Sequence, residues 1–117
     1  ILLDAPCTAT GIFARHPDVL HRVRPKDIAQ LSATQSAMLA RVGSWLKPGG
    51  TLIYATCSLE PEEGEAIAET GAGVGLRLDS VSEQELVAGF TPHPKGWVRI
   101  YPQLGYDGFF IARFKPA

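Results

Sequence analysis

The hydrophobic pattern divides the chain into short apolar runs and longer periodic segments. Residues 1–3 and 51–55 are nearly continuous apolar runs, which is typical of strands buried on both faces of a parallel sheet. Residues 27–46 carry apolar side chains at helical spacing instead. Asp27 and Gln30 form a capping-box-like start for that helix, and the Lys-Pro-Gly-Gly turn at 47–50 ends it. The expected apolar face consists of Ile28, Leu31, Met38, Leu39, Val42, Trp45 and Leu46.

The second half of the chain continues to alternate helix and strand signals. Pro61 suits the first turn of a helix, which we expect to run to about residue 70 and to stop at Gly71. The later elements are a strand over 76–81, a short helix that begins at the capping box Ser82-x-x-Glu85 and ends near Gly89, and strands over 97–101 and 109–114 with turn signals between them. This order predicts an α/β layered sheet.

Both cysteines of the chain follow predicted strands. Cys7 comes soon after the strand at 1–3, and Cys57 comes directly after the strand at 51–55. A right-handed crossover through the helix at 27–46 makes these strands parallel, so their carboxyl ends meet at one edge of the sheet. Ligands bind at that edge in open α/β sheets. We therefore expect the two thiols to approach one another, as a nucleophile and a helper, and to stay reduced rather than form a disulfide.

Composition narrows the classes of function. A chain of 117 residues with 45% hydrophobic residues fits one small domain. Its formal net charge of −1 gives no overall basic field, so contact with nucleic acid must come from a local patch. The basic stretch 15–26 flanks the expected edge, either as a solvated loop or as a contact for phosphates. No apolar run is long enough to span a membrane, and no signal peptide is visible; we expect a cytoplasmic protein.

Several polar residues near this edge have two interpretations each. Cys57 is either a small buried side chain or a thiol activated by the helix start that follows it. Asp4 either caps the neighbouring loop or faces a ligand. The histidines are not spaced with the cysteines as zinc ligands are, so no metal site is expected. The glycine-rich segment 71–75 follows a helix rather than a strand, which favours a helix stop over a phosphate loop.

Five segments of the chain, in this order, carry a specific resemblance. They are Asp4-Ala5-Pro6-Cys7-Thr8-Ala9-Thr10-Gly11, Arg15-His16-Pro17-Asp18, Gly49-Gly50-Thr51-Leu52-Ile53-Tyr54-Ala55-Thr56-Cys57-Ser58, Pro61-Glu62-Glu63 and Asp107-Gly108-Phe109-Phe110. Together they resemble the Sun/Nop family of RNA (cytosine-5) methyltransferases. The likeness extends along the whole chain and is strongest to bacterial members that modify small-subunit ribosomal RNA.

The resemblance implies a fold, a cofactor and roles for individual residues. The fold is a Rossmann-like, S-adenosylmethionine-dependent α/β sheet in which 109–114 is a late antiparallel strand. Cys57 in the Thr-Cys-Ser motif corresponds to the nucleophile, and Cys7 in the Pro-Cys motif assists release of the enzyme from the methylated base. Asp4 lies beside both cofactor and target base. Pro6, Arg15 and Arg22 are further candidates for contact with the RNA. Thiolate addition at C6 of cytosine makes C5 nucleophilic, and the base must leave its stack to be reached.

The chain departs from the family in what it lacks. The glycine-rich cofactor loop and the acidic ribose-binding residue of the family precede the first strand here, and the chain begins inside a strand pattern without methionine. We therefore expect residues 1–117 to be the C-terminal part of a methyltransferase catalytic domain, inactive alone, whose partner is its own N-terminal part. Three alternatives stay open: exchanged roles for Cys7 and Cys57, since DNA cytosine-5 methyltransferases use the Pro-Cys cysteine as nucleophile; a non-catalytic RNA-binding module; and a methyltransferase for a small molecule or protein.

Overall fold

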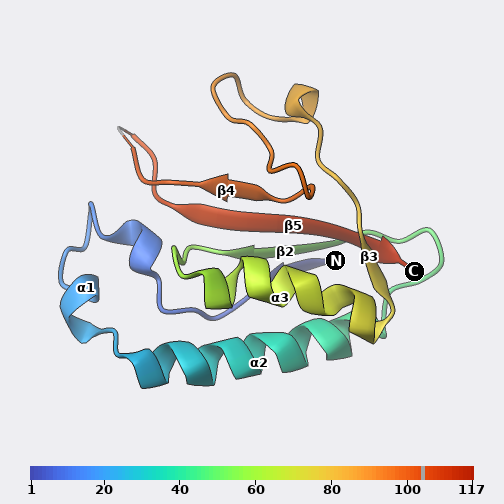
Figure 1. Cartoon of the computed structure of the whole chain (residues 1–117), viewed down its shortest axis with the longest axis horizontal. Coiled ribbons are helices and arrows are strands. Elements are labelled where there is room, and N and C mark those ends of the chain that lie inside the picture. The colour runs from blue at the N-terminus through green and yellow to red at the C-terminus, as the bar shows by residue number, and fades with distance from the viewer. Residues whose placement is uncertain (104) are drawn as a thin grey trace.

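A five-stranded mixed sheet forms the centre of the chain (Figure 1). The structure is a computed structural model that describes residues 1–103 and 105–117. Strand β1 (Leu2–Asp4) pairs in parallel with β2 (Leu52–Thr56), and β2 pairs antiparallel with β5 (Phe109–Pro116). Two short strands pair antiparallel with the other side of β5: β4 (Val98–Ile100) with the first half of β5, and β3 (Leu76–Leu78) with its end. The predicted α/β class, with parallel strands and a late antiparallel strand, is confirmed.

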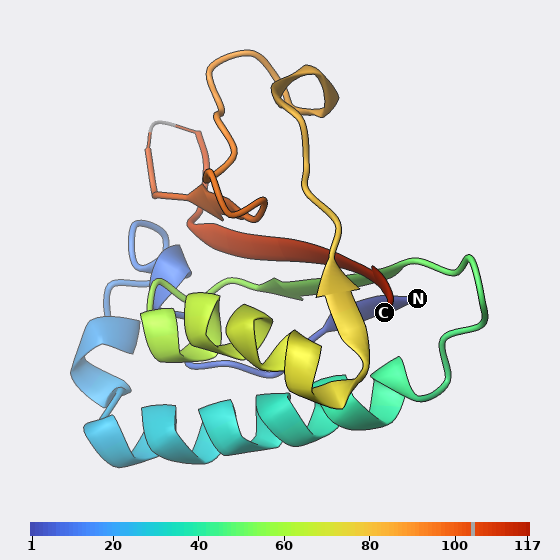
Figure 2. The same cartoon turned by 45° about the vertical axis from the view of Figure 1, so that its right-hand side comes forward.

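Two helices lie on the same side of the sheet in both views (Figures 1 and 2). Helix α2 (Pro25–Gly43) makes the crossover between β1 and β2, and α3 (Glu65–Glu69) follows β2. A short helix, α1 (Val19–Arg22), precedes α2. The remaining helical turns are 3-10 turns at Thr10–Ile12, Pro61–Glu63, Thr70–Val74 and Glu83–Glu85. Within the described ranges, no helix combines the length and the apolar character needed to cross a bilayer.

The hydrophobic core lies between the sheet and these two helices. Alternate side chains of β2 and β5 point into it, and Tyr54, Phe110 and Phe114 are 0% exposed. Leu39 of α2 packs on the same cluster. The buried Tyr54 hydroxyl donates a hydrogen bond of 2.6 Å to the carbonyl of Glu63, which ties the core to the segment that follows β2.

Helix α2 begins earlier and ends earlier than the sequence indicated. Pro25 occupies the first turn, and Asp27 caps from the third position by accepting the backbone N–H of Arg24 at 2.9 Å. The proline fixes a helical φ there, which moves the start two residues upstream. The helix ends at Gly43, so Trp45 lies beyond it and is 60% exposed. The prediction that Trp45 belongs to the apolar face is therefore wrong.

The segment after β2 differs in a similar way. The single helix predicted over 61–70 is divided into a 3-10 turn, α3 and a second 3-10 turn that contains Gly71. The stop is Gly75, whose φ of +80° is accessible to glycine without strain. The strand predicted over 76–81 ends at Leu78, and the capping box of Ser82 and Glu85 closes one 3-10 turn rather than a helix reaching Gly89.

Strand β1 is buried on one face only. Leu3 is 6% exposed, whereas Leu2 is 70% exposed. The prediction of a strand buried on both faces is therefore wrong for this chain, because α2 and α3 cover the same side of the sheet. β1 is also the edge of the sheet, so an apolar edge and face are open there.

Two glycines of one 3-10 turn test the packing between the helical layer and β5. A Cβ at Gly71 would lie 2.8 Å from the Phe114 ring, whereas a Cβ at Gly73 would have nothing within 4 Å. We expect Gly71→Ala to lower the free energy of unfolding by about 1–3 kcal/mol through overpacking. The matched control Gly73→Ala should leave it nearly unchanged. Urea unfolding followed by circular dichroism measures both, and equal stability of the two variants would contradict this packing.

Candidate active site

The two thiols meet at the carboxyl edge of the parallel strand pair. β1 ends at Asp4, which is in register with Ala55 of β2, and the chain reaches a cysteine shortly after each strand. The Sγ atoms of Cys7 and Cys57 are 3.6 Å apart, and both are free, half-buried thiols. The convergence expected from the parallel crossover is confirmed.

Three loops cross beside the thiols at Gly11. Its N–H donates to the carbonyl of Cys57 at 2.8 Å, and its own carbonyl accepts the N–H of Gly108 at 2.7 Å. A Cβ at Gly11 would lie 2.4 Å from the Gly108 oxygen and 2.5 Å from the Cys57 oxygen. Only glycine allows this approach of backbone to backbone. The loops after β1, after β2 and before β5 are thereby fixed to one another.

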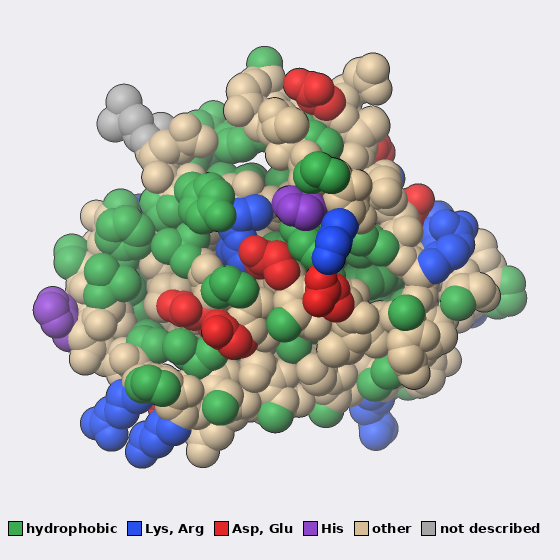
Figure 3. Space-filling view, viewed as in Figure 1, with side chains coloured by type: hydrophobic (Ala, Val, Ile, Leu, Met, Phe, Trp, Pro, Cys, Tyr) green, Lys and Arg blue, Asp and Glu red, His purple; other side chains and the backbone are tan. Residues whose placement is uncertain are grey.

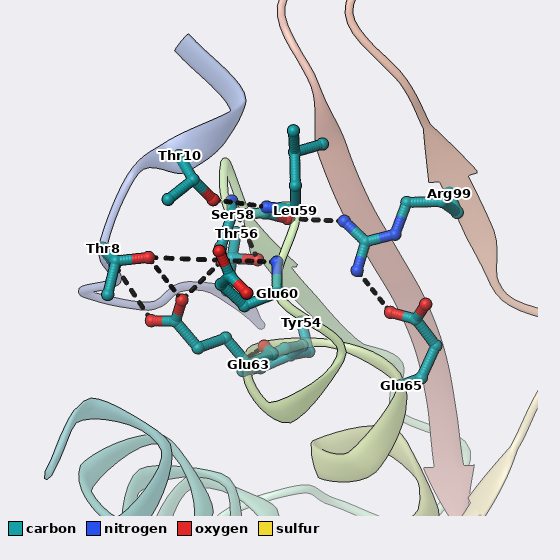
Figure 4. A network of polar contacts seen from close by, with 10 residues as sticks. All are labelled: Thr8, Thr10, Tyr54, Thr56, Ser58, Leu59, Glu60, Glu63, Glu65 and Arg99. Carbon is teal, nitrogen blue, oxygen red and sulfur yellow. Dashed lines mark hydrogen bonds and ion pairs between the residues drawn. The ribbon is translucent and has the colours of Figure 1, made fainter. Parts of the chain in front are cut away.

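A buried carboxylate joins the residues that follow the two cysteines (Figure 4). Glu63 is 0% exposed. Its Oε1 accepts the backbone N–H of Thr8 at 2.9 Å and Nε2 of Gln35 at 3.1 Å. Its Oε2 accepts the hydroxyl of Thr8 at 2.6 Å and that of Ser58 at 2.5 Å. Four donors thus satisfy a carboxylate that would otherwise be costly to bury.

Sequence reasoning missed this role for Glu63. Acidic residues are favourable at this position because they interact with the dipole of the following helix. The neighbouring Glu62 fits this explanation equally well, but its side chain is exposed. The 3-10 turn Pro61–Glu63 directs one of the two side chains inward. The available signal was the pair of hydroxyl residues, Thr8 and Ser58, directly after the two cysteines.

Arg99 holds the backbone carbonyl of Ser58, the residue directly after Cys57. Its side chain is 7% exposed and donates to the carbonyl of Ser58 at 2.5 Å. The guanidinium also pairs with Glu65 (Figure 4). It lies over the Phe110 ring, 5.0 Å from the centroid. Sequence analysis did not identify Arg99, because its partners come from distant parts of the chain. The carbonyl after Cys57 is therefore fixed by a charged donor.

The contact between the thiols makes them chemically different. A hydrogen bond from Cys7 stabilises the Cys57 thiolate and lowers the pKa of Cys57 from 9.0 to about 7, although burial opposes the shift. The same hydrogen bond raises the pKa of Cys7, and burial adds to that rise. The cause is thus the neighbouring thiol rather than the helix start considered above. Cys57 therefore has the larger thiolate fraction of the pair at neutral pH, and Cys7 retains its proton.

Two further predicted site residues, Asp4 and Pro6, precede Cys7 in the chain. Asp4 is exposed at the end of β1, and its negative charge acts on Cys57. Pro6 is exposed, and its carbonyl accepts Nε2 of Gln35 at 2.8 Å.

The two predicted arginines lie in different settings. Arg15 forms a two-pronged ion pair with Asp107, with its Nη2 2.7 Å and its Nε 3.1 Å from the carboxylate oxygens. Arg22 lies on α1 and pairs with Asp18 at 3.0 Å, with both side chains mostly exposed. The structure thus attaches Arg15 to the loop before β5, whereas Arg22 pairs locally within the α1 segment; both arginine side chains are exposed.

The reactivity of Cys57 with an alkylating reagent tests the thiol pair. Only the thiolate reacts, so the rate should rise with pH around a midpoint near 7, since the pKa of Cys57 is about 7. Cys7 should react far more slowly throughout this range because its pKa is raised. Iodoacetamide labelling resolved by peptide mass spectrometry measures both. A midpoint for Cys57 near that of an ordinary thiol, or faster labelling of Cys7, would contradict the assignment.

Comparison with known protein families gives one match along almost the whole chain. The model of the family described as 16S rRNA methyltransferase RsmB/F matches residues 1–115. The ribosomal RNA small subunit methyltransferase B of Erwinia tasmaniensis is 44% identical over 115 residues, which cover 97% of this chain and 25% of that protein. The protein of the same name from Shewanella oneidensis is 40% identical over 119 residues, covering 100% and 27%.

Solved structures agree with the family match. NSun6 from Pyrococcus horikoshii with SFG superimposes with a TM-score of 0.80 at 32% identity, over 99% of this chain and 29% of that one. A methyltransferase homolog protein from Pyrococcus horikoshii gives a TM-score of 0.75 at 34% identity, over 100% and 38%. The chain spans about a quarter of the length of the curated relatives it matches. The match over residues 1–115, together with the fold and the paired thiols, shows that the chain belongs to the 16S rRNA methyltransferase RsmB/F family.

Proposed function

We propose that this chain carries the catalytic cysteines of an enzyme that transfers a methyl group from S-adenosylmethionine to C5 of cytosine in RNA, through a covalent bond between Cys57 and the base. The observation that carries the proposal is the Sγ–Sγ distance of 3.6 Å between Cys7 and Cys57 at one edge of the sheet. The substrate we propose is small-subunit ribosomal RNA, in accordance with the names of the relatives.

Cys57 has the properties that the first step requires. Cytosine C5 is a poor nucleophile, so a thiolate must first add to C6 and form a carbon–sulfur bond, which places electron density on C5. A pKa of about 7 gives Cys57 a large thiolate fraction at neutral pH. Gly11 binds the carbonyl of Cys57 and Arg99 binds the carbonyl of the next residue, Ser58, so the sulfur presents a defined position to the base.

Cys7 has the properties of a helper in the last step. After methyl transfer a base removes the C5 proton, the C6–sulfur bond breaks, and its electron pair returns to Cys57. The S–H of Cys7 stabilises the departing thiolate through the same contact that lowers the pKa of Cys57. A sulfur of lower pKa is a better leaving group. The raised pKa of Cys7 disfavours the exchanged roles, in which Cys7 would be the nucleophile.

Asp4 is the residue of this chain that fits the cofactor. Its exposed carboxylate stands at the carboxyl end of a parallel strand, where ligands bind in open α/β sheets. A carboxylate there attracts a positively charged sulfonium group and also accepts hydrogen bonds from the edge of a base. S-adenosylmethionine, when bound, supplies the electrophilic methyl group. The bound SFG of the NSun6 structure, an analogue of S-adenosylmethionine, supports S-adenosylmethionine as the cofactor of the family.

RNA would meet the basic side chains near the start of α2. Arg22, Arg24 and Lys26 are exposed there, and Figure 3 shows Lys and Arg side chains at the corresponding end of the molecule. Such side chains contact phosphates and position an RNA strand. Arg15 would act differently from Arg22, since its guanidinium is bound to Asp107 of the loop before β5, whereas Arg22 pairs with Asp18 at the start of its own helix.

The open edge of the sheet fits a place within a larger catalytic domain. Parallel strands are normally covered on both faces, yet Leu2 is 70% exposed and β1 has a neighbouring strand on one side only. We propose that an N-terminal part of the enzyme, which holds most of the cofactor site, packs against this edge and face. The full activity then belongs to the whole enzyme.

A covalent trap tests the proposed function. RNA that contains 5-azacytidine has nitrogen in place of C5, so an enzyme thiolate that adds at C6 cannot be released by loss of a C5 proton. The whole enzyme should form a covalent adduct with this RNA that survives denaturing electrophoresis. Cys57→Ala should abolish the adduct, whereas Cys7→Ala should retain it.

Other outcomes of the trap separate the alternatives. Loss of the adduct in Cys7→Ala with retention in Cys57→Ala would reverse the two roles. No adduct in the native enzyme, with RNA binding intact, would favour a non-catalytic RNA-binding module. Methyl transfer that does not depend on RNA would indicate a small-molecule or protein substrate.

A further inference from the structure

We propose that Glu63 is a positioning residue for the two cysteines: it sets their separation by binding the residue that follows each of them. The inference deepens the proposed function and rests on it, because a fixed separation matters for catalysis only if both thiols act on one base. The geometry and reactivity of the thiols can nevertheless be measured without RNA.

The contacts of Glu63 bring two distant segments together. Thr8 and Glu63 are 55 residues apart in the sequence, and Thr8 gives the carboxylate both its backbone N–H at 2.9 Å and its hydroxyl at 2.6 Å. Ser58 gives its hydroxyl at 2.5 Å. One side chain thus binds the residue after Cys7 and the residue after Cys57.

Gln35 of α2 completes the attachment on the side of Cys7. Its Nε2 donates to Glu63 at 3.1 Å and to the carbonyl of Pro6 at 2.8 Å. The residues on both sides of Cys7 are therefore bonded to this pair of buried side chains. Gln35 is 0% exposed, as is Glu63, so water does not compete for these hydrogen bonds.

The network requires a group that only accepts hydrogen bonds. Backbone N–H and amide NH₂ groups point at Oε1, and two hydroxyls point at Oε2. In glutamine, an NH₂ at the Oε1 position would face two N–H donors that cannot accept from it. An NH₂ at the Oε2 position would make the two hydroxyls accept instead of donate, so their O–H groups would lose the carboxylate as acceptor. At least one buried partner then loses its hydrogen bond, and the loops move apart to relieve the conflict.

The pH profile of Cys57 reports this movement. Its pKa is low mainly because Cys7 donates a hydrogen bond to it, so a longer separation must raise it. Asp4, Asp107 and Arg15 are the charged groups that act on Cys57, and none of them is altered by a substitution at Glu63. A purely structural role for Glu63 would change stability without moving this profile.

The experiment compares Glu63→Gln with the native chain and with Glu62→Gln, which makes the same chemical change on an exposed side chain of the same turn. Alkylation of Cys57 by iodoacetamide is followed against pH by peptide mass spectrometry, and circular dichroism reports folding. We expect the midpoint to rise in Glu63→Gln and the rate at pH 7 to fall roughly threefold to tenfold, as the thiolate fraction decreases. Glu62→Gln should match the native chain.

A folded Glu63→Gln with an unmoved midpoint would overturn the proposal, and so would an equal shift in Glu62→Gln. If Glu63→Gln does not fold, Thr8→Val decides by the same criteria. Valine keeps the shape and the backbone N–H of Thr8 but removes the hydroxyl that Glu63 accepts, so a smaller shift in the same direction is expected. These results are independent of the azacytidine adduct: a shift without an adduct would refute the proposed function and leave the positioning role intact.

Discussion

The parallel pairing of β1 with β2 determines where the two thiols of this chain meet. Three residue pairs of this ladder, from Leu2 with Ile53 to Asp4 with Ala55, bring the carboxyl ends of two strands to one edge. Cys7 and Cys57, 50 residues apart in the sequence, then lie with their sulfurs 3.6 Å apart. At that distance one thiol donates to the other, and two chemically identical side chains acquire different pKa values, lowered for Cys57 and raised for Cys7.

Strand pairing alone does not fix sulfur atoms that lie on loops beyond the strands. The structure adds three restraints from separate segments: the backbone crossing at Gly11, the carboxylate of Glu63 and the guanidinium of Arg99. Two of them are charged side chains that are almost completely buried. Burying charge is unfavourable unless each charge is fully hydrogen-bonded, which is the case for Glu63 and its four donors.

The features that the sequence predicted depend on local patterns, whereas the features it missed depend on contacts between segments that are distant in the sequence. Apolar runs and helical spacing predicted β1, β2, α2 and the convergence of the thiols, because these depend on local pattern and on the handedness of one crossover. The inward turn of Glu63 and the contacts of Arg99 depend on segments that meet only after folding. Glu62 and Glu63 are adjacent and chemically identical, so no local rule separates them. The exposed Leu2 was mistaken for a buried residue because the pattern reports apolar character and not the presence of a covering layer.

The roles of individual residues came from the resemblance of five segments rather than from periodicity. The structure adds a physical reason to prefer Cys57 over Cys7 as the nucleophile. The contact between the thiols lowers the pKa of Cys57 and raises that of Cys7. It also changes the interpretation of Arg15, whose guanidinium is bound to Asp107 and so joins the basic stretch to the loop before β5.

Controlled oxidation of the native chain tests the central claim, that the two sulfurs share one edge of the sheet. Diamide takes up the two thiol hydrogens as it joins two sulfurs, and contraction from 3.6 Å to a disulfide of about 2.05 Å needs only local movement. Mass spectrometry should show a monomer lighter by two hydrogen atoms, with the peptides of Cys7 and Cys57 linked to each other. Thiols that stay free under these conditions, or that link only between molecules, would contradict the account.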